Sequence, residues 1–183
     1  MTGNLFFFAP SEQTATAARR TAVRLVERVT AGDAEAFGEL YRAYAPMVHG
    51  IVLARVNRDD VDDLVQDVFL SAYRKLSSLR DPAAVGAWLA MIARNCAAEY
   101  YRRKRPTEEL PEDLCDRETP RTEAREILNA IRSLPDAYRE TLVLRLVEGM
   151  TGPEIAERTG LKPESVRVNL HRGMKLLREK LGL

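Results

Sequence analysis

The sequence has few of the residues that build metal centres, disulfide frameworks and membrane spans. Its 183 residues include two cysteines and two histidines, and Cys96 and Cys115 share neither a paired spacing nor a similar context. The sequence therefore predicts neither a zinc site nor disulfides, and a reducing, cytoplasmic setting fits best. We expect no cofactor. The apolar run near the N-terminus is too short to span a bilayer and lacks the basic start of a signal peptide, so no membrane insertion is expected.

An excess of charge of either sign is also absent, since 28 basic residues stand against 27 acidic ones. A net charge near zero argues against adhesion of the whole molecule to nucleic acid or to an anionic membrane. Any charge-driven binding must therefore come from local patches. The apolar share of 45% supports folded cores, and the 30% of charged residues suggests abundant exposed helical surface.

Alternating strand patterns are missing, and every strong periodicity in the chain is helical. Apolar residues recur at spacings of three and four over residues 37–52, 61–76 and 87–104. Asp33 is a candidate N-cap for the first of these helices, Pro82 separates the second from the third, and Pro106 ends the third. Shorter helices are expected beyond residue 122. The fold is therefore predicted to be all-α.

Residues 106–122 have a different character, with three prolines, many acidic side chains and few apolar anchors. This composition predicts a flexible acidic linker between two small helical domains, residues 21–105 and 123–183. Residues 1–20 are expected to form a poorly ordered N-terminal extension, either a frayed terminus or a small docking segment.

The most informative segment is a predicted helix-turn-helix that begins at Gly152 and ends at His171. Thr151 and Glu154 match a capping box, and Gly160 falls where the chain must turn sharply with a positive φ. In such a motif the second helix enters the major groove of DNA. The alternative is a helical hairpin with a solvated basic face.

The outward face of the second helix suits duplex DNA. Residues 163–180 contain five basic residues and two acidic ones. Arg167 could pair with guanine through two hydrogen bonds, and Val168 could touch a thymine methyl group. Arg172 and Lys175 are better placed for phosphates, which add affinity rather than sequence choice. His171 alone is weak support, because a lone histidine is more often a bystander than a ligand.

An aspartate cluster begins the helix predicted over residues 61–76. Asp60, Asp63 and Asp67 fall on one face of that helix. One interpretation is a metal site, although aspartates along one straight helix diverge. A second is a solvated first turn favoured by the helix dipole. A third, favoured by the Gln66 and aromatic side chains mixed into the charge, is a docking face for a basic partner.

The helix over residues 87–104 ends in a basic run. Arg94 and residues 102–105 supply five positive charges against Glu99, with Trp88, Tyr100 and Tyr101 interleaved. Basic side chains and aromatic rings together suit binding and stacking on single-stranded nucleic acid. The alternative is that the cations complement the helix C-terminus and that Trp88 belongs to the core.

Three segments carry a resemblance to a known family. They read "DDLVQDVFLSAYRKL", "AWLAMIARN" and "LPDAYRETLVLRLVEGMTGPEIAERTGLKPESVRVNLHRG". In this order and spacing, over residues 23–181, they resemble the extracytoplasmic-function (ECF) group of bacterial sigma factors. The resemblance implies a non-enzymatic RNA polymerase initiation factor, with sigma region 2 and region 4 joined by a flexible linker. Its implied partners are core RNA polymerase, promoter DNA and an anti-sigma factor.

The resemblance also implies a role for three sets of residues, with no catalytic or metal-binding residue among them. Core polymerase would be bound by Asp62, Asp63, Gln66, Asp67 and Phe69. The minus-10 element would be recognised and melted by the loop over residues 79–86 and the helix after it, the candidates being Arg80, Asp81, Trp88, Arg94, Asn95, Arg102 and Arg103. The minus-35 element would be bound by Arg145, Ser165, Arg167, Val168, His171, Arg172 and Lys175, with Arg145 on the DNA backbone.

Two other classes of protein remain as alternatives. A stand-alone helix-turn-helix regulator would bind symmetric operators without polymerase. A metal-dependent enzyme would use the aspartate cluster, although the sequence offers it neither supporting histidines nor a nucleophile.

Overall fold

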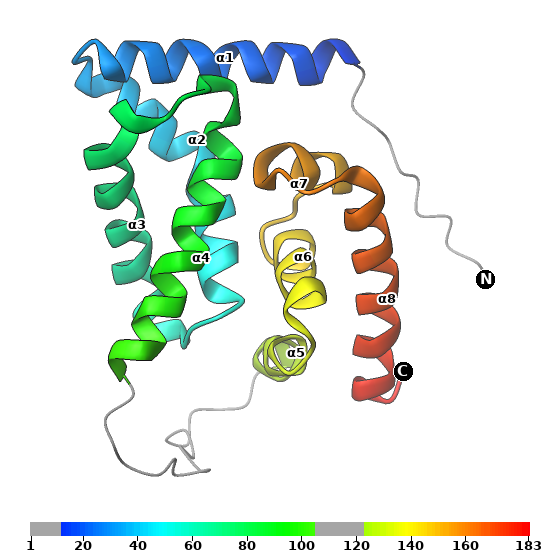
Figure 1. Ribbon diagram of the computed structural model, residues 1–183. Helices are drawn as coiled ribbons and strands as arrows, with labels where there is room; N and C mark the ends of the chain where they lie inside the picture. The colour runs from blue at the N-terminus through cyan, green and yellow to red at the C-terminus, as the bar shows by residue number, and fades with distance from the viewer. Residues whose placement is uncertain (1–11, 105–122) are drawn as a thin grey trace.

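The computed structural model describes residues 12–104 and 123–183, and this part of the chain is helical without strands (Figure 1). The all-α prediction is confirmed. The α-helices are α1 (Glu12–Thr30), α2 (Ala34–Leu53), α3 (Val61–Lys75), α4 (Val85–Lys104), α5 (Glu123–Arg132), α6 (Asp136–Leu146), α7 (Gly152–Thr159) and α8 (Pro163–Leu181). Short 3-10 helices lie at η1 (Arg58–Asp60), η2 (Leu76–Ser78) and η3 (Pro82–Ala84). The predicted linker, residues 106–122, lies outside the described residues.

The first domain consists of α1 to α4. Asp33 caps α2 as expected, because its carboxylate accepts a hydrogen bond from the Ala36 amide at 3.1 Å. Helix α1 lies across one end of the other three helices (Figure 1). It buries a stripe formed by Ala22, Leu25, Val26 and Val29.

The N-terminal extension differs from its prediction. Residues 1–20 were expected to be poorly ordered, but α1 begins at Glu12. The physical reason is continuity with the amphipathic stripe that starts at Ala22, since a helix nucleated there can extend over the preceding alanines and arginines, which are good helix formers. Residues 1–11 lie outside the described residues.

The second domain consists of α5 to α8 and contains the predicted helix-turn-helix. Thr151 and Glu154 form both hydrogen bonds of a capping box at the start of α7. Gly160 ends α7 with a φ of 73°, a left-handed conformation that glycine adopts without steric cost. Val166 and Leu170 of α8 are buried, so the second helix packs back onto the domain.

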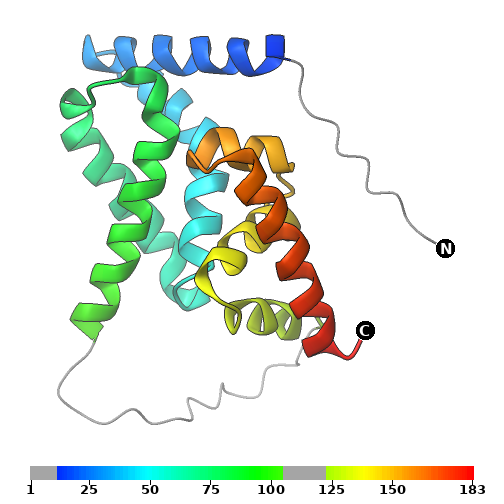
Figure 2. The ribbon, with the colours of Figure 1, turned by 45° about the vertical axis from the view of Figure 1, so that its right-hand side comes forward.

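The two domains pack against each other rather than standing apart. Helices α6 and α7 lie against α2 and α4 in both views (Figures 1 and 2), and the buried apolar residues of both domains form one continuous core. Glycines allow this approach. A Cβ atom on Gly50 would lie 2.7 Å from Leu144, and one on Gly86 would lie 2.5 Å from the Arg158 carbonyl oxygen. The interface therefore depends on helix surfaces that lack side chains at the contact.

Candidate nucleic-acid and partner interfaces

The exposed face of α8 is the candidate duplex-binding surface. The side chains predicted to contact the minus-35 element are exposed along this helix, and they are Ser165, Arg167, Val168, His171, Arg172 and Lys175. Burial of Val166, Leu170 and Gly173 on the opposite side fixes which face α8 presents. The helix begins at Pro163, so its exposed first turns project from the turn at Gly160, as a recognition helix requires.

Arg145 is positioned differently from the other predicted minus-35 residues. It is half-buried on α6, and its guanidinium donates a hydrogen bond to the Met150 carbonyl at 3.1 Å. This bond holds the turn that leads into α7. In this structure Arg145 therefore supports the motif, and only its remaining donors are left for a DNA phosphate.

The acidic face of α3 presents its charges to solvent. Asp62, Asp63, Gln66 and Asp67 are exposed on one side of this helix. Exposed Leu70 and Tyr73 lie further along the same helix and add apolar surface. Among the residues that the structure describes, no group of three or more histidine, cysteine, aspartate or glutamate side chains is arranged to hold a metal ion.

Phe69 does not belong to that exposed face, contrary to the prediction. Its side chain is buried at 3% exposure, and its ring packs at 4.5 Å from the Tyr41 ring and 6.4 Å from the Phe37 ring, centroid to centroid. Phe69 is thus part of the domain core, since it continues the apolar stripe of Val65 and Val68. Tyr73, at 56% exposure, is the exposed aromatic residue of α3.

The basic end of α4 is only partly available. Asn95, Arg102 and Arg103 are exposed, and Arg103 pairs with Glu99 at 2.6 Å one helical turn away. Trp88 is half-buried against the core, as its alternative interpretation held. The tyrosines are also engaged, because the Tyr101 hydroxyl donates to the Arg55 carbonyl.

The loop before α4 carries the two other candidates for minus-10 binding. Arg80 is exposed. Asp81 caps η3, accepting a hydrogen bond from the Ala83 amide at 3.0 Å. Asp81 therefore shapes the loop in which Arg80 lies.

Arg94 lies in the interface between the domains. Its guanidinium donates to both carboxylate oxygens of Glu140 on α6, at 2.7 and 3.1 Å, and Arg55 donates to the same carboxylate at 2.6 Å. Burial alone would raise the pKa of Glu140, but the hydrogen bonds and charges of Arg94 and Arg55 outweigh it and hold that pKa below its usual value. Glu140 therefore stays ionised and ties α6 to the first domain.

Further polar contacts between the domains involve residues that the sequence did not single out. The His49 ring lies 2.6 Å from the Glu148 carboxylate. Arg132 donates to the carbonyl oxygens of Leu53 and Val56, and Arg158 donates to that of Ala43. No short-range pattern signals such pairs, because their partners lie more than 75 residues apart in the chain.

The fold and its surfaces define a two-domain helical protein of the Sigma-70 class. Residues 40–107 match Sigma-70 region 2, and residues 124–177 match Sigma-70 region 4. The first match covers the acidic face of α3 and the basic helix α4, and the second covers the helix-turn-helix.

Comparison with curated relatives places the chain in one family within this class. The chain is 34% identical to the ECF RNA polymerase sigma-E factor of Haemophilus influenzae, over 86% of this chain and 93% of that protein. It is also 34% identical to RNA polymerase sigma factor CarQ of Myxococcus xanthus, over 86% of this chain and 95% of that protein. The chain belongs to the ECF family of RNA polymerase sigma factors.

Solved structures resemble the fold over most of the chain. CnrH in complex with the cytosolic domain of CnrY aligns with a TM-score of 0.65 and 26% identity, covering 88% of this chain and 97% of that one. The sigma factor RpoE of Bartonella quintana, solved with the anti-sigma factor NepR, aligns with a TM-score of 0.56 at 20% identity, covering 80% and 97%, and supports the fold alone. In the part of the chain that the structure describes, no helix is both long and apolar enough to cross a membrane.

Proposed function

We propose that this protein is an alternative sigma factor that binds core RNA polymerase in the cytoplasm and directs initiation at its own class of promoters, without catalytic activity of its own. The observation that carries the proposal is the exposed basic face of α8 on a helix-turn-helix, in a chain whose two domains match Sigma-70 regions 2 and 4. The contact with the minus-10 element is assigned to the first domain. Control by an anti-sigma factor is included, because membership of the ECF family implies such a partner.

Each surface has a proposed role. Asp62, Asp63, Gln66 and Asp67 form the docking face for polymerase, with Tyr73 in the place first given to Phe69. Arg80, Asn95, Arg102 and Arg103 are the exposed candidates for opened minus-10 DNA. The exposed face of α8 binds the minus-35 duplex, with Arg167 as the main base contact.

Arg94 can take its proposed place on DNA only after the domains separate. In the closed arrangement its guanidinium is held by the carboxylate of Glu140. A phosphate and a buried carboxylate compete for the same donors. We therefore expect the polymerase-bound protein to have α6 displaced from α4, with the polymerase setting the distance between the two promoter contacts.

Run-off transcription tests this function directly. Core polymerase plus this protein, with a pool of genomic fragments as template, should yield transcripts that start at a defined set of promoters. Core polymerase alone is the control. The absence of promoter-specific transcripts would refute the proposal, and tight binding of the free protein to symmetric operators would support the stand-alone regulator instead.

The docking face is tested by reversing its charge. Replacing Asp63→Arg and Asp67→Arg together should weaken binding to core polymerase at least tenfold, because repulsion replaces attraction at a charged interface. Binding is measured by fluorescence anisotropy of labelled protein. The matched control is Glu27→Arg with Glu35→Arg, which makes the same charge change at exposed positions on α1 and α2. Equal affinities for the two variants would contradict the assignment.

A further inference from the structure

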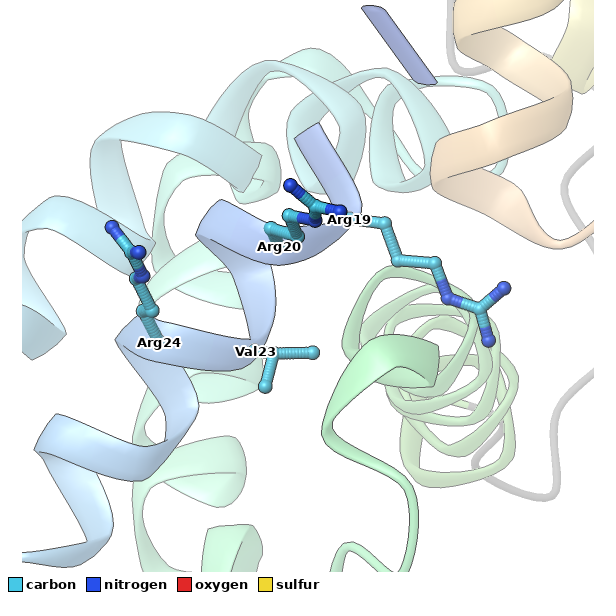
Figure 3. A pocket seen from close by; sticks show the side chains of 4 residues that line it. All are labelled: Arg19, Arg20, Val23 and Arg24. Atoms are coloured by element: carbon cyan, nitrogen blue, oxygen red, sulfur yellow. The ribbon is translucent and has the colours of Figure 1, made fainter. Parts of the chain in front are cut away.

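The middle of α1 carries a basic surface to which no function has yet been assigned. Arg19, Arg20 and Arg24 are exposed and lie with Val23 around a shallow hollow on this helix (Figure 3). Among the described residues none of the three has an ion-pair partner. Arg28, on the last turn of the same helix, differs because it pairs with Asp33 and Glu39 at 2.7 and 3.0 Å.

The three unpaired guanidinium groups point in different directions. Arg19 and Arg24 extend to opposite sides of the hollow, and Arg20 lies between them (Figure 3). A site for one small anion would need these groups to converge on a point. Diverging groups instead suit an extended polyanion that passes along the helix. Arg20 and Arg24 are one turn apart, about 6 Å along the axis, so they can reach different phosphates of one strand.

The position of α1 indicates which polyanion it meets. Helix α1 packs against η3 and η2, which border the loop that holds Arg80. In both ribbon views its N-terminal half projects past α2, α3 and α4 (Figures 1 and 2). A strand held at Arg80 would continue along α1, where Arg24, Arg20 and Arg19 follow one another toward this projecting half. Nucleic acid is therefore favoured over an acidic protein segment.

We propose that Arg19, Arg20 and Arg24 bind backbone phosphates of the promoter strand that is opened next to the Arg80 loop. This inference rests on the proposed function and extends its DNA surface onto α1. The contact is independent of sequence, because arginine–phosphate pairs position a strand without recognising bases. It adds affinity that falls as salt rises, through release of counterions.

The test uses the complete holoenzyme and a fluorescent promoter fragment with a pre-opened minus-10 bubble. Replacing Arg19, Arg20 and Arg24 with alanine should weaken binding about tenfold and lower the slope of log K against log salt by about 2. The loss of affinity should be the same for promoters that differ in their minus-10 sequence. The control replaces Arg42 and Arg58, two exposed arginines outside α1 and α8, with alanine and should bind as the wild type does.

Each outcome is decisive. An unchanged affinity and salt slope in the α1 variant would overturn the inference. Weaker binding to core polymerase, measured without DNA, would overturn it in favour of a protein partner for this face. Circular dichroism checks that the alanine variant is folded. A variant with Arg20→Lys and Arg24→Lys should keep most of the slope of log K against log salt that the alanine variant loses, because lysine also pairs with phosphate. If wild-type holoenzyme itself fails on the bubble promoter, the proposed function fails instead.

Discussion

The carboxylate of Glu140 is 4% exposed and lies between the guanidinium groups of Arg55 and Arg94. Two cations around one buried anion satisfy it fully, and no buried side-chain polar atom among the described residues lacks a partner. Removal of the anion would leave two partly buried positive charges facing each other. The cluster of Glu140, Arg55 and Arg94 therefore favours one relative position of the two domains.

Glu140→Ala should lower the free energy of unfolding by about 3 kcal/mol, because it leaves the two arginines without their counterion. Urea unfolding followed by circular dichroism measures this loss. Glu126→Ala, at an exposed position on α5, is the control and should change stability by less than about 0.5 kcal/mol. Equal effects of the two substitutions would show that the buried carboxylate does not hold the domains together.

At the scale of single residues, exposure was predicted well on α8 and less completely in the first domain, where Phe69 is buried and Trp88 and Arg94 are half-buried. The α8 candidates are exposed because their helix packs on one side only. Phe69 was expected to be exposed because the resemblance grouped it with Asp63, Gln66 and Asp67, whereas its place on the apolar stripe determines its burial. The ion pair of Arg94 with Glu140 was not predicted, because the two residues lie 46 positions apart in the sequence.

At the scale of elements, the ends of α2, α3 and α4, each with one apolar face, were predicted to within a few residues. The short-range rules of capping and turn formation located the start of α2, the capping box of α7 and the turn at Gly160. Helix α1 was not predicted, although Ala22, Leu25, Val26 and Val29 are spaced as an apolar stripe of a helix. The contact of α4 with α7 has no local signal, because it depends on an absent side chain at Gly86.

Gly86→Ala should therefore separate α7 from α4 while both domains stay folded. The added methyl group would meet the Arg158 carbonyl oxygen at 2.5 Å and the Tyr44 ring at 3.1 Å, and backbone cannot yield as a flexible side chain does. Small-angle X-ray scattering should give a larger radius of gyration with unchanged circular dichroism.

Gly38→Ala is the control for this substitution. Its new methyl group has no neighbour closer than 3.7 Å, so it should leave the radius unchanged and stabilise α2 by about 0.5 to 1 kcal/mol. The same radius in both variants would mean that close approach at Gly86 is not needed for closure.

At the scale of the whole molecule, domain closure should depend on pH through His49. The hydrogen bond and charge of Glu148 raise the pKa of His49, opposed by partial burial; the charge of Asp62 adds to the rise, and that of Arg58 lowers it. Because the pKa of His49 is raised in the folded protein, the His49–Glu148 pair stabilises the fold fully below about pH 6.5. This stabilisation is lost as the pH rises through the raised pKa. Glu140, whose pKa is lowered, contributes above about 4.5 and loses its contribution in acid.

Closure should consequently weaken on going from pH 6 to alkaline pH. The radius of gyration of the free protein over that range measures it, and His49→Gln should make the radius independent of pH there. His171→Gln is the control, since His171 is exposed on α8, and it should keep the wild-type dependence. A wild-type radius that does not change with pH would show that the His49–Glu148 pair does not control closure.

On the proposed function, the carboxylate of Glu140 would also compete with DNA for Arg94. Because it occupies Arg94 in the closed form, the free protein would bind a minus-10 strand through that arginine only in the fraction of molecules that are open. The apparent dissociation constant is the intrinsic one divided by that fraction, so every 1.4 kcal/mol of closing free energy costs about tenfold in affinity. On the proposed function, binding to minus-10 DNA through Arg94 would therefore be confined to molecules whose domains polymerase has separated, and the free protein would have low affinity for other DNA.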